Sequence, residues 1–166
     1  HLDAYVIHVV RDGRAVLNSY LRAYPNLTVE TVSQRWLNNL EASEKVYGSV
    51  AADRRMQVRY EALATNPTNT VQGVCDFLGI PFEPDMLEYW KHDHNYIAGS
   101  RSAKALMARY RDQPVPDATQ EIHGNYYSEM DLTIKLDQRW KDELGTTKLE
   151  KFQQIVGTRN QPFEWS

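Results

Sequence analysis

Residues 5–19 read YVIHVVRDGRAVLNS, which joins a β-branched run, a polar turn and a helical repeat of apolar residues. A short β-branched run bounded by polar residues predicts a buried strand over residues 5–10. Apolar residues then recur at helical spacing as far as Pro25, which cannot continue a helix. This part of the chain therefore predicts a strand, a tight turn and a helix in immediate succession.

The rest of the chain continues this alternation of strands and helices. The elements that we predict are a helix capped by Thr28, a strand over Met56–Tyr60, a helix that begins at Asn66-Pro67 and is ended by Gly79, short helices near Trp90 and over Ser102–Tyr110, a helix over Leu132–Leu144, and a last helix that starts at a capping box of Thr147 and Glu150. No hairpin turn joins the two strands, so we expect an α/β layer with parallel strands. Because two strands make a poor sheet alone, we expect further strands upstream of His1.

Composition and charge narrow the classes of function. The chain has 166 residues, which suits one domain, and its net charge of −3 disfavours a nucleic-acid binder with a broad basic surface. Its single cysteine, Cys75, can form neither an intrachain disulfide nor a cysteine-based metal site. His92 and His94 have no further ligand at a convincing spacing, so we expect no metal. No apolar run has the length of a membrane span, and a start at His1 without a visible signal peptide favours a fragment or a processed product.

Arg11 and Ser19 are the first candidates for a binding site. Arg11 follows the predicted strand, at the edge where α/β sheets bind ligands, and the free N–H groups and dipole of the following helix favour an anion. Ser19 lies two helical turns along, so a guanidinium and a hydroxyl could converge on one phosphate. The spacing alone leaves a plainer alternative open, in which Arg11 and Asp12 form an ordinary ion pair and Ser19 is a tolerated helix serine.

The same segment resembles the 3′-phosphate-binding segment of sulfotransferases that use 3′-phosphoadenosine 5′-phosphosulfate (PAPS). In that family a strand is followed by the pattern Arg-(Asp/Asn)-x-(Arg/Lys)-x-x-x-x-Ser, which matches residues 11–19 here. The resemblance implies that Arg11 and Ser19 hold the 3′-phosphate of the donor.

Further segments resemble the family in the same order along the chain. Val58–Leu63 resembles the family's Tyr-Glu-Asp-Leu segment, which implies that Tyr60 packs near the donor's adenine; a half-buried strand tyrosine is the alternative. His94–Arg101 is similar to a His…Gly-(Asn/Ser) segment, which implies that Arg101 helps to bind the 3′-phosphate, although the expected basic position falls on Ala103. The remaining similar segments are Asn66–Pro81 and Leu136–Trp140.

The resemblance implies a P-loop-NTPase-like sulfotransferase fold, with a partial parallel sheet flanked by helices and a helix-rich C-terminal half. Residues 1–166 would then form a single partial domain, because the family's 5′-phosphosulfate-binding loop and catalytic base have no match here. The implied activity is sulfuryl transfer from PAPS, without a metal, to a hydroxyl or amine of a small molecule or glycan. We expect the fragment alone to be inactive and a companion chain to supply the missing N-terminal half.

Two other functions stay open at this point. A nucleotide or small-molecule kinase of the wider P-loop group shares the α/β layer and the anion-binding turn, but it needs ATP and magnesium carboxylates. A non-catalytic fragment retained for binding or assembly is the alternative from a different class. The expected location is cytoplasmic, or the Golgi lumen if a membrane anchor precedes His1.

Overall fold

Two parallel strands form the centre of the structure, a computed structural model that describes residues 4–92, 101–114 and 132–166. The strands β1 (Val6–Val10) and β2 (Arg55–Arg59) pair in register from the first residue of each to the last. This arrangement confirms the predicted parallel pairing and brings the carboxyl ends of both strands to one edge.

Helices follow both strands, as the sequence pattern indicates. The α-helices of the described residues are α1 (Gly13–Ala23), α2 (Val29–Gly48), α3 (Tyr60–Thr65), α4 (Pro67–Leu78), α5 (Arg101–Tyr110), α7 (Trp140–Glu143) and α8 (Gly145–Val156). The 3₁₀ helices are η1 (Ala52–Arg54), η2 (Pro84–Leu87), η3 (Tyr89–Lys91) and η5 (Gly157–Phe163). Thr28 caps α2 and Asn66 caps α4, each by accepting a hydrogen bond from a backbone N–H three residues on, as predicted.

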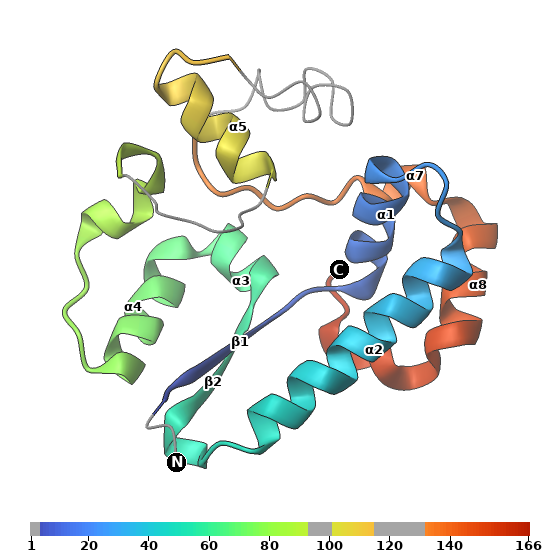
Figure 1. Cartoon of the computed structure of the whole chain (residues 1–166), viewed down its shortest axis with the longest axis horizontal. Coiled ribbons are helices and arrows are strands. Elements are labelled where there is room, and N and C mark those ends of the chain that lie inside the picture. Colours follow the sequence, from blue (N-terminus) through green and yellow to red (C-terminus); the bar gives the residue numbers. More distant parts are fainter. Residues whose placement is uncertain (1–3, 93–100, 115–131) are drawn as a thin grey trace.

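The core lies between the helices on one side of the strands. Figure 1 shows β1 and β2 in the middle of the molecule, with α3 and α4 on one side and α1, α2, α7 and α8 on the other. The larger hydrophobic cluster comes from these last four helices, and its buried residues are Ala15, Leu17, Val32, Trp140, Leu144, Phe152 and Val156. Trp36 of α2 packs both against this cluster and against a smaller one that contains Val10, the last residue of β1. The helical core therefore fixes the point where β1 ends.

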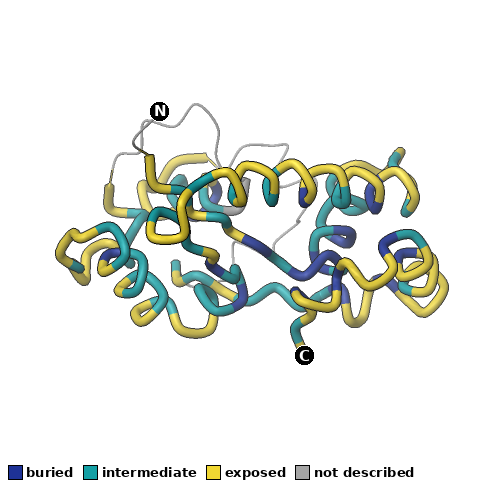
Figure 2. The backbone as a smooth tube through the Cα atoms, turned by 90° about the horizontal axis from the view of Figure 1, so that it is seen from below, coloured by how far each residue is buried: buried dark blue, intermediate teal, exposed yellow. Residues whose placement is uncertain are grey.

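The sequence predicted a buried strand, but β1 is buried only in part. Val10 is 5% exposed, whereas Ile7 and Val9 are 38% and 58% exposed. In the part of the chain that the structure describes, β2 is the one strand that pairs with β1, so the outer edge of β1 lacks the neighbours that cover a buried strand. Figure 2 shows the chain passing from exposed to buried as β1 runs into α1.

The predicted helix over Leu132–Leu144 is wrong for most of its length. Helix is confined to α7 in this stretch, and residues 132–139 are irregular. The carboxylate of Asp137 accepts hydrogen bonds from the backbone N–H of Arg139 at 3.2 Å and from its guanidinium. Such a local side-chain arrangement competes with the hydrogen bonds of a helix, so the helix begins only at Trp140.

The last helix starts earlier than predicted. α8 begins at Gly145, directly after α7, and no side chain caps it, so the predicted capping box of Thr147 and Glu150 does not form. Leu144 has helical dihedral angles and its N–H donates to the carbonyl of Trp140, but Gly145 has a positive φ of 67°. This left-handed residue, which glycine adopts without steric cost, separates α7 from α8 and sets the start of α8. Gly157 ends α8, as predicted, at a positive φ of 56°.

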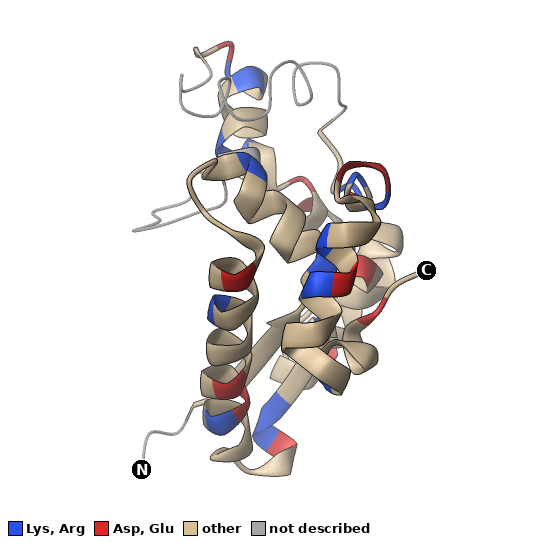
Figure 3. Ribbon diagram, turned by 90° about the vertical axis from the view of Figure 1, so that its right-hand side faces the viewer, with Lys and Arg blue, Asp and Glu red and all other residues tan. Residues whose placement is uncertain are grey.

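Ion pairs join α2 to the C-terminal helices. Figure 3 shows acidic and basic positions alternating along α2. Glu30 pairs with Lys151 of α8, and Glu44 pairs with Arg159 of η5. Both pairs are exposed, so each contributes at most about 1 kcal/mol to stability.

Neither α2 nor another helix in the described ranges is long and apolar enough to cross a membrane.

Candidate anion-binding site

The carboxyl ends of β1 and β2 bring Arg11 and Tyr60 together. Val10 pairs with Arg59 in the parallel register, so the residues that follow them leave the sheet at the same edge. The guanidinium of Arg11 lies over the ring of Tyr60, with its central carbon 4.4 Å from the ring centroid. Two residues that the sequence analysis singled out separately are thus in direct contact.

Arg11 keeps hydrogen-bond donors for a ligand. One terminal NH₂ group faces the backbone carbonyl of Asp137 at 3.5 Å, the outer limit of a hydrogen bond. The Nε atom is buried and has no hydrogen-bond partner among the described residues. A guanidinium offers five N–H donors in a planar fork, and buried donors in proteins are nearly always paired. The arrangement therefore fits an oxyanion, such as a phosphate, lying against Arg11.

The N–H groups of the turn after β1 are not part of that site. The N–H of Asp12 donates to Oε1 of Glu61 at 2.8 Å. The N–H of Gly13 donates to Oδ1 of Asn160 at 2.7 Å, and that of Arg14 to the Asp12 carboxylate at 2.9 Å. The sequence analysis expected free N–H groups here to attract an anion. That expectation is wrong for these three donors, because side chains satisfy them.

The carboxylate of Asp12 is buried and bonded to other groups of the protein. Asp12 is 1% exposed and accepts hydrogen bonds from the Arg14 guanidinium, the Asn160 amide and the Trp165 N–H. Burial acts to raise the pKa of Asp12, but the hydrogen bonds from Arg14 and Trp165 and the charge of Arg14 outweigh it and hold the pKa below its ordinary value. The ion pair of Asp12 is therefore with Arg14, and not with Arg11 as the plainer alternative had it.

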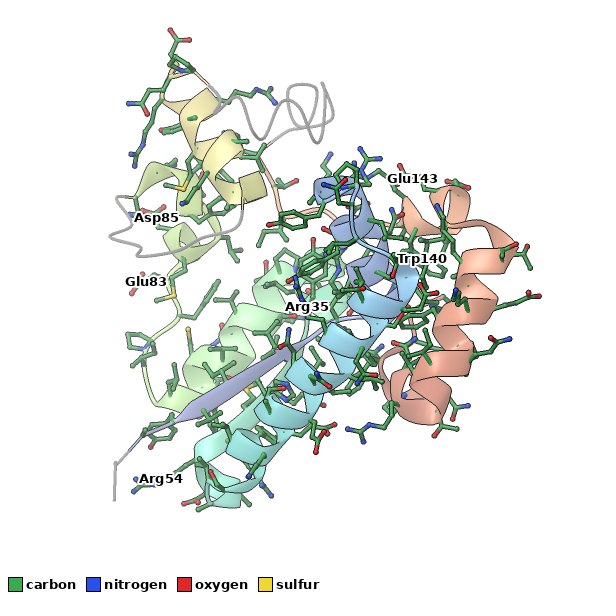
Figure 4. The ribbon with its side chains drawn as sticks, turned by 45° about the vertical axis from the view of Figure 1, so that its right-hand side comes forward. Arg35, Arg54, Glu83, Asp85, Trp140 and Glu143 are labelled. Atoms are coloured by element: carbon green, nitrogen blue, oxygen red, sulfur yellow. The ribbon has the colours of Figure 1, made fainter. Side chains whose placement is uncertain are left out.

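Ser19 lies on α1 and is half-buried. The helix is fixed there by its neighbours, because Asn18 donates to the carboxylate of Glu143 at 2.6 Å and Arg22 pairs with the second oxygen of that group at 2.6 Å. Figure 4 shows Glu143 and Trp140 on α7 beside α1. The binding of one phosphate by both Arg11 and Ser19 stays a prediction.

Arg101 is the first residue of α5, and its side chain lies outside what the structure describes. Residues 93–100, which include most of the similar segment His94–Arg101, lie outside it as well. The predicted contact of Arg101 with the 3′-phosphate therefore stays a prediction. Within the described ranges no group of three or more His, Cys, Asp and Glu side chains could hold a metal ion.

A segment to which the sequence analysis assigned no role in the site completes this edge of the sheet. The hydroxyl of Tyr60 donates to the backbone carbonyl of Lys135 at 2.9 Å. Two residues on, the carboxylate of Asp137 binds two guanidinium nitrogens of Arg139 at 2.6 and 2.9 Å. We call residues 135–139 the edge segment. Its backbone carbonyls therefore contact both Tyr60 and Arg11, the latter through Asp137.

Charge also links the edge segment to Arg11. Burial acts to raise the pKa of Asp137, but the hydrogen bonds and charge of Arg139, with a smaller contribution from the charge of Arg11, hold it below its ordinary value. The sequence did contain a signal for this turn, because Asp137 and Arg139 have the same Asp-x-Arg spacing as Asp12 and Arg14.

The sequence matches a known family. A family model described as "Sulfotransferase family" matches residues 3–84, which contain both strands. The protein-tyrosine sulfotransferase of Drosophila melanogaster is 27% identical over 93 residues, covering 52% of this chain and 19% of that protein. The carbohydrate sulfotransferase 5 of Mus musculus is 24% identical over 179 residues, covering 94% of this chain and 40% of that protein. The chain thus spans between a fifth and two fifths of the length of these curated relatives.

The fold has a counterpart among solved structures. The sulfotransferase domain of the olefin synthase of Synechococcus PCC 7002 matches with a TM-score of 0.54 and 23% identity. The match covers 90% of this chain and 49% of that chain. This likeness, together with the parallel strands and flanking helices, confirms the predicted fold class.

Proposed function

The chain belongs to the sulfotransferase family, and from this premise we propose that it forms the part of a PAPS-dependent enzyme that holds the donor's 3′-phosphate. The observation that carries the proposal is the state of Arg11. Its guanidinium lies at the carboxyl edge of the sheet, is stacked on Tyr60, and has a buried Nε without a partner among the described residues.

A phosphate suits this position on chemical grounds. The planar fork of Arg11 can donate two parallel hydrogen bonds to phosphate oxygens, and a charged acceptor makes each bond stronger than a neutral one. Ser19 on α1 would add a hydroxyl donor, and Arg101 at the start of α5 a second cation. The carboxylates of Asp12 and Asp137 each form their ion pair with another arginine, so Arg11 is in a salt bridge with neither of them.

In the proposed reaction, an acceptor hydroxyl or amine attacks the sulfur of PAPS. The bond between sulfur and the 5′-phosphate oxygen breaks, 3′,5′-ADP leaves, and a base takes the proton of the acceptor. This chain's contribution is to hold one end of the donor in place, so that the sulfuryl group is aligned with the acceptor. A further part of the protein or a companion chain would supply the phosphosulfate loop and the base.

The acceptor that we propose is a hydroxyl of a small molecule or glycan. The two relatives are named for a protein tyrosine and for a carbohydrate, and the hydroxyl is the acceptor group common to both. An amine stays a second option within the same scheme, because its lone pair attacks sulfur in the same way.

The test is a calorimetric measurement of 3′,5′-ADP binding to the full chain and to Arg11→Ala. We expect the substitution to weaken binding by about 2–3 kcal/mol, the scale of a lost charge-assisted contact. The matched control is Arg54→Ala. Arg54 also lies near a tyrosine ring, 5.9 Å from that of Tyr5, but at the opposite end of the sheet, as Figure 4 shows. Its removal should leave the affinity unchanged.

Two outcomes would contradict the proposal. Equal affinity of the wild type and Arg11→Ala for 3′,5′-ADP would remove Arg11 from the site. Tighter binding of ATP than of 3′,5′-ADP would favour the kinase alternative, because ATP has no 3′-phosphate.

A further inference from the structure

The ring of Tyr60 is held at both of its ends. Tyr60 is the first residue of α3, directly after β2, so the helix fixes its backbone. Its hydroxyl donates to the carbonyl of Lys135 at 2.9 Å. A tyrosine side chain has two rotatable angles, and anchoring the hydroxyl as well as the backbone restricts both. The ring therefore presents a fixed face at the edge of the sheet.

Arg11 lies against that fixed face. The central carbon of its guanidinium is 4.4 Å from the centroid of the Tyr60 ring, which is within the range of a cation–π contact. A terminal NH₂ group points at the carbonyl of Asp137, whose side chain is itself held by Arg139. Within the described ranges, the guanidinium thus contacts the Tyr60 ring and the edge segment, and the hydroxyl of Tyr60 joins these two to each other.

This geometry gives Tyr60 a role that the family resemblance did not imply. Resting on the proposed function, we infer that Tyr60 is a positioning residue that acts on the donor through Arg11. The ring and its hydroxyl, anchored on the edge segment, orient the guanidinium so that its remaining donors face the 3′-phosphate. Packing against the donor's adenine, the role implied by the resemblance, would instead act on the base.

These two roles differ in the part of the nucleotide that they affect, so a pair of ligands separates them. The ligands are 3′,5′-ADP and 5′-AMP, which share the adenine and the 5′-phosphate and differ in the 3′-phosphate. Tyr60→Phe keeps the ring and removes the hydroxyl that contacts Lys135. We expect its affinity for 3′,5′-ADP to fall roughly fivefold, the usual effect of one lost hydrogen bond, and its affinity for 5′-AMP to stay unchanged.

Two further variants complete the experiment. Tyr60→Leu removes the stacked ring as well and should reduce the affinity for 3′,5′-ADP roughly tenfold or more, again without an effect on 5′-AMP. Tyr5→Phe removes a tyrosine hydroxyl at the far end of the sheet and should change neither affinity. Unchanged 5′-AMP binding also shows that each variant is folded, because a purely structural defect would weaken the binding of both nucleotides.

A double-mutant cycle tests the route through Arg11. If Tyr60 acts by orienting Arg11, then Tyr60→Phe should have no further effect on 3′,5′-ADP binding once Arg11→Ala is present. Additive losses would overturn the inference.

The remaining outcomes separate this inference from the proposed function. An equal loss of affinity for both nucleotides in Tyr60→Phe or Tyr60→Leu would overturn the positioning role in favour of adenine packing. If Arg11→Ala abolishes the preference for 3′,5′-ADP but both Tyr60 variants keep it, the inference fails and the proposed function stands. If the wild type shows no preference for 3′,5′-ADP over 5′-AMP, both fail together.

Discussion

The same Asp-x-Arg turn occurs at two places in the molecule and serves two different ends. In both the Asp12–Arg14 turn and the Asp137–Arg139 turn, the carboxylate accepts hydrogen bonds from the N–H and the guanidinium of the residue two positions on. The first carboxylate is 1% exposed, whereas the side chain of the second is 23% exposed. The local chemistry is thus shared, and the surroundings differ.

Those surroundings decide what each turn does. Asp12 also accepts from Trp165 and Asn160, so its turn anchors the C-terminal residues on the end of β1. Asp137 instead directs its backbone carbonyl towards Arg11 and lies within the edge segment. We conclude that the first turn serves the stability of the fold and the second serves the shape of the candidate site.

The largest expected difference between the turns is in stability. Asp12→Ala leaves the Arg14 guanidinium and the Trp165 N–H without their buried acceptor, and we expect it to lower the free energy of unfolding by about 3–5 kcal/mol. Asp137→Ala breaks a pair that water reaches, and a loss of about 1 kcal/mol is expected. Urea unfolding of both variants measures this, and equal losses would show that the two turns are equivalent.

The second-largest expected difference is the loss of stability when the middle residue of each turn is changed to alanine. A Cβ on Gly13 would lie 2.7 Å from Cζ of Phe152 and 2.9 Å from Cε2 of Trp36, which is closer than packed atoms approach. Gly13→Ala should therefore cost about 1–3 kcal/mol of stability through overpacking. Gln138→Ala, the matched change in the half-buried turn, should stay within about 0.5 kcal/mol. A thermal melt of each variant decides the matter, and a fully stable Gly13→Ala would contradict the close packing.

A smaller effect is expected in the dependence of stability on pH. The pKa of Asp12 and that of Asp137 both lie below the ordinary value of 3.8. A carboxyl with a lower pKa in the folded state stabilises that state above the unfolded pKa, and the contribution is lost as the pH falls through the folded pKa. Stability should therefore decline below about pH 5. Asp12→Asn should flatten this decline in urea titrations from neutral to acid pH, and an unaltered slope would exclude Asp12 as its source.

The last comparison concerns Arg11, for which a small effect on stability is expected. Its Nε bonds to nothing among the described residues, and its stacking on Tyr60 is worth about 0.5–1 kcal/mol. Arg11→Ala should therefore lower the free energy of unfolding by no more than this amount, while 3′,5′-ADP binding falls far more. A loss of stability like that of Asp12→Ala would show that Arg11 serves the fold and not a ligand.

Much of the fold could be predicted because its signals are local. The β-branched run of β1, the caps Thr28 and Asn66 and the glycine at position 79 each act within a few residues, and all are found in the structure. The second strand was predicted one residue too late, because Tyr60 begins α3 and does not end β2. The irregular stretch 132–139 was missed, although the Asp137–Arg139 turn that interrupts the helix is local, because an Asp-x-Arg spacing alone does not distinguish such a turn from helix.

The candidate site divides in the same way. Arg11 was found from its place after a strand, and its contact with Tyr60 follows from the parallel register. The partners of the turn could not be predicted, because Glu61 and Asn160 are ordinary polar residues in the sequence, 49 and 147 positions away from the N–H groups that they accept from. Burial and long-range hydrogen bonding, which no local pattern records, select them.

The docking of Asn160 and Trp165 onto the β1–α1 turn has a consequence for how the protein is made. Asn160 is 147 residues behind its partner Gly13, so at ~5–20 residues per second the ribosome adds it roughly 7–30 seconds later. Throughout that interval the nascent turn lacks the side chain that will fix it. The β1–α1 turn beside the candidate site is therefore among the last features to mature during translation, and a chain stalled before residue 160 would carry Arg11 on an unfinished turn.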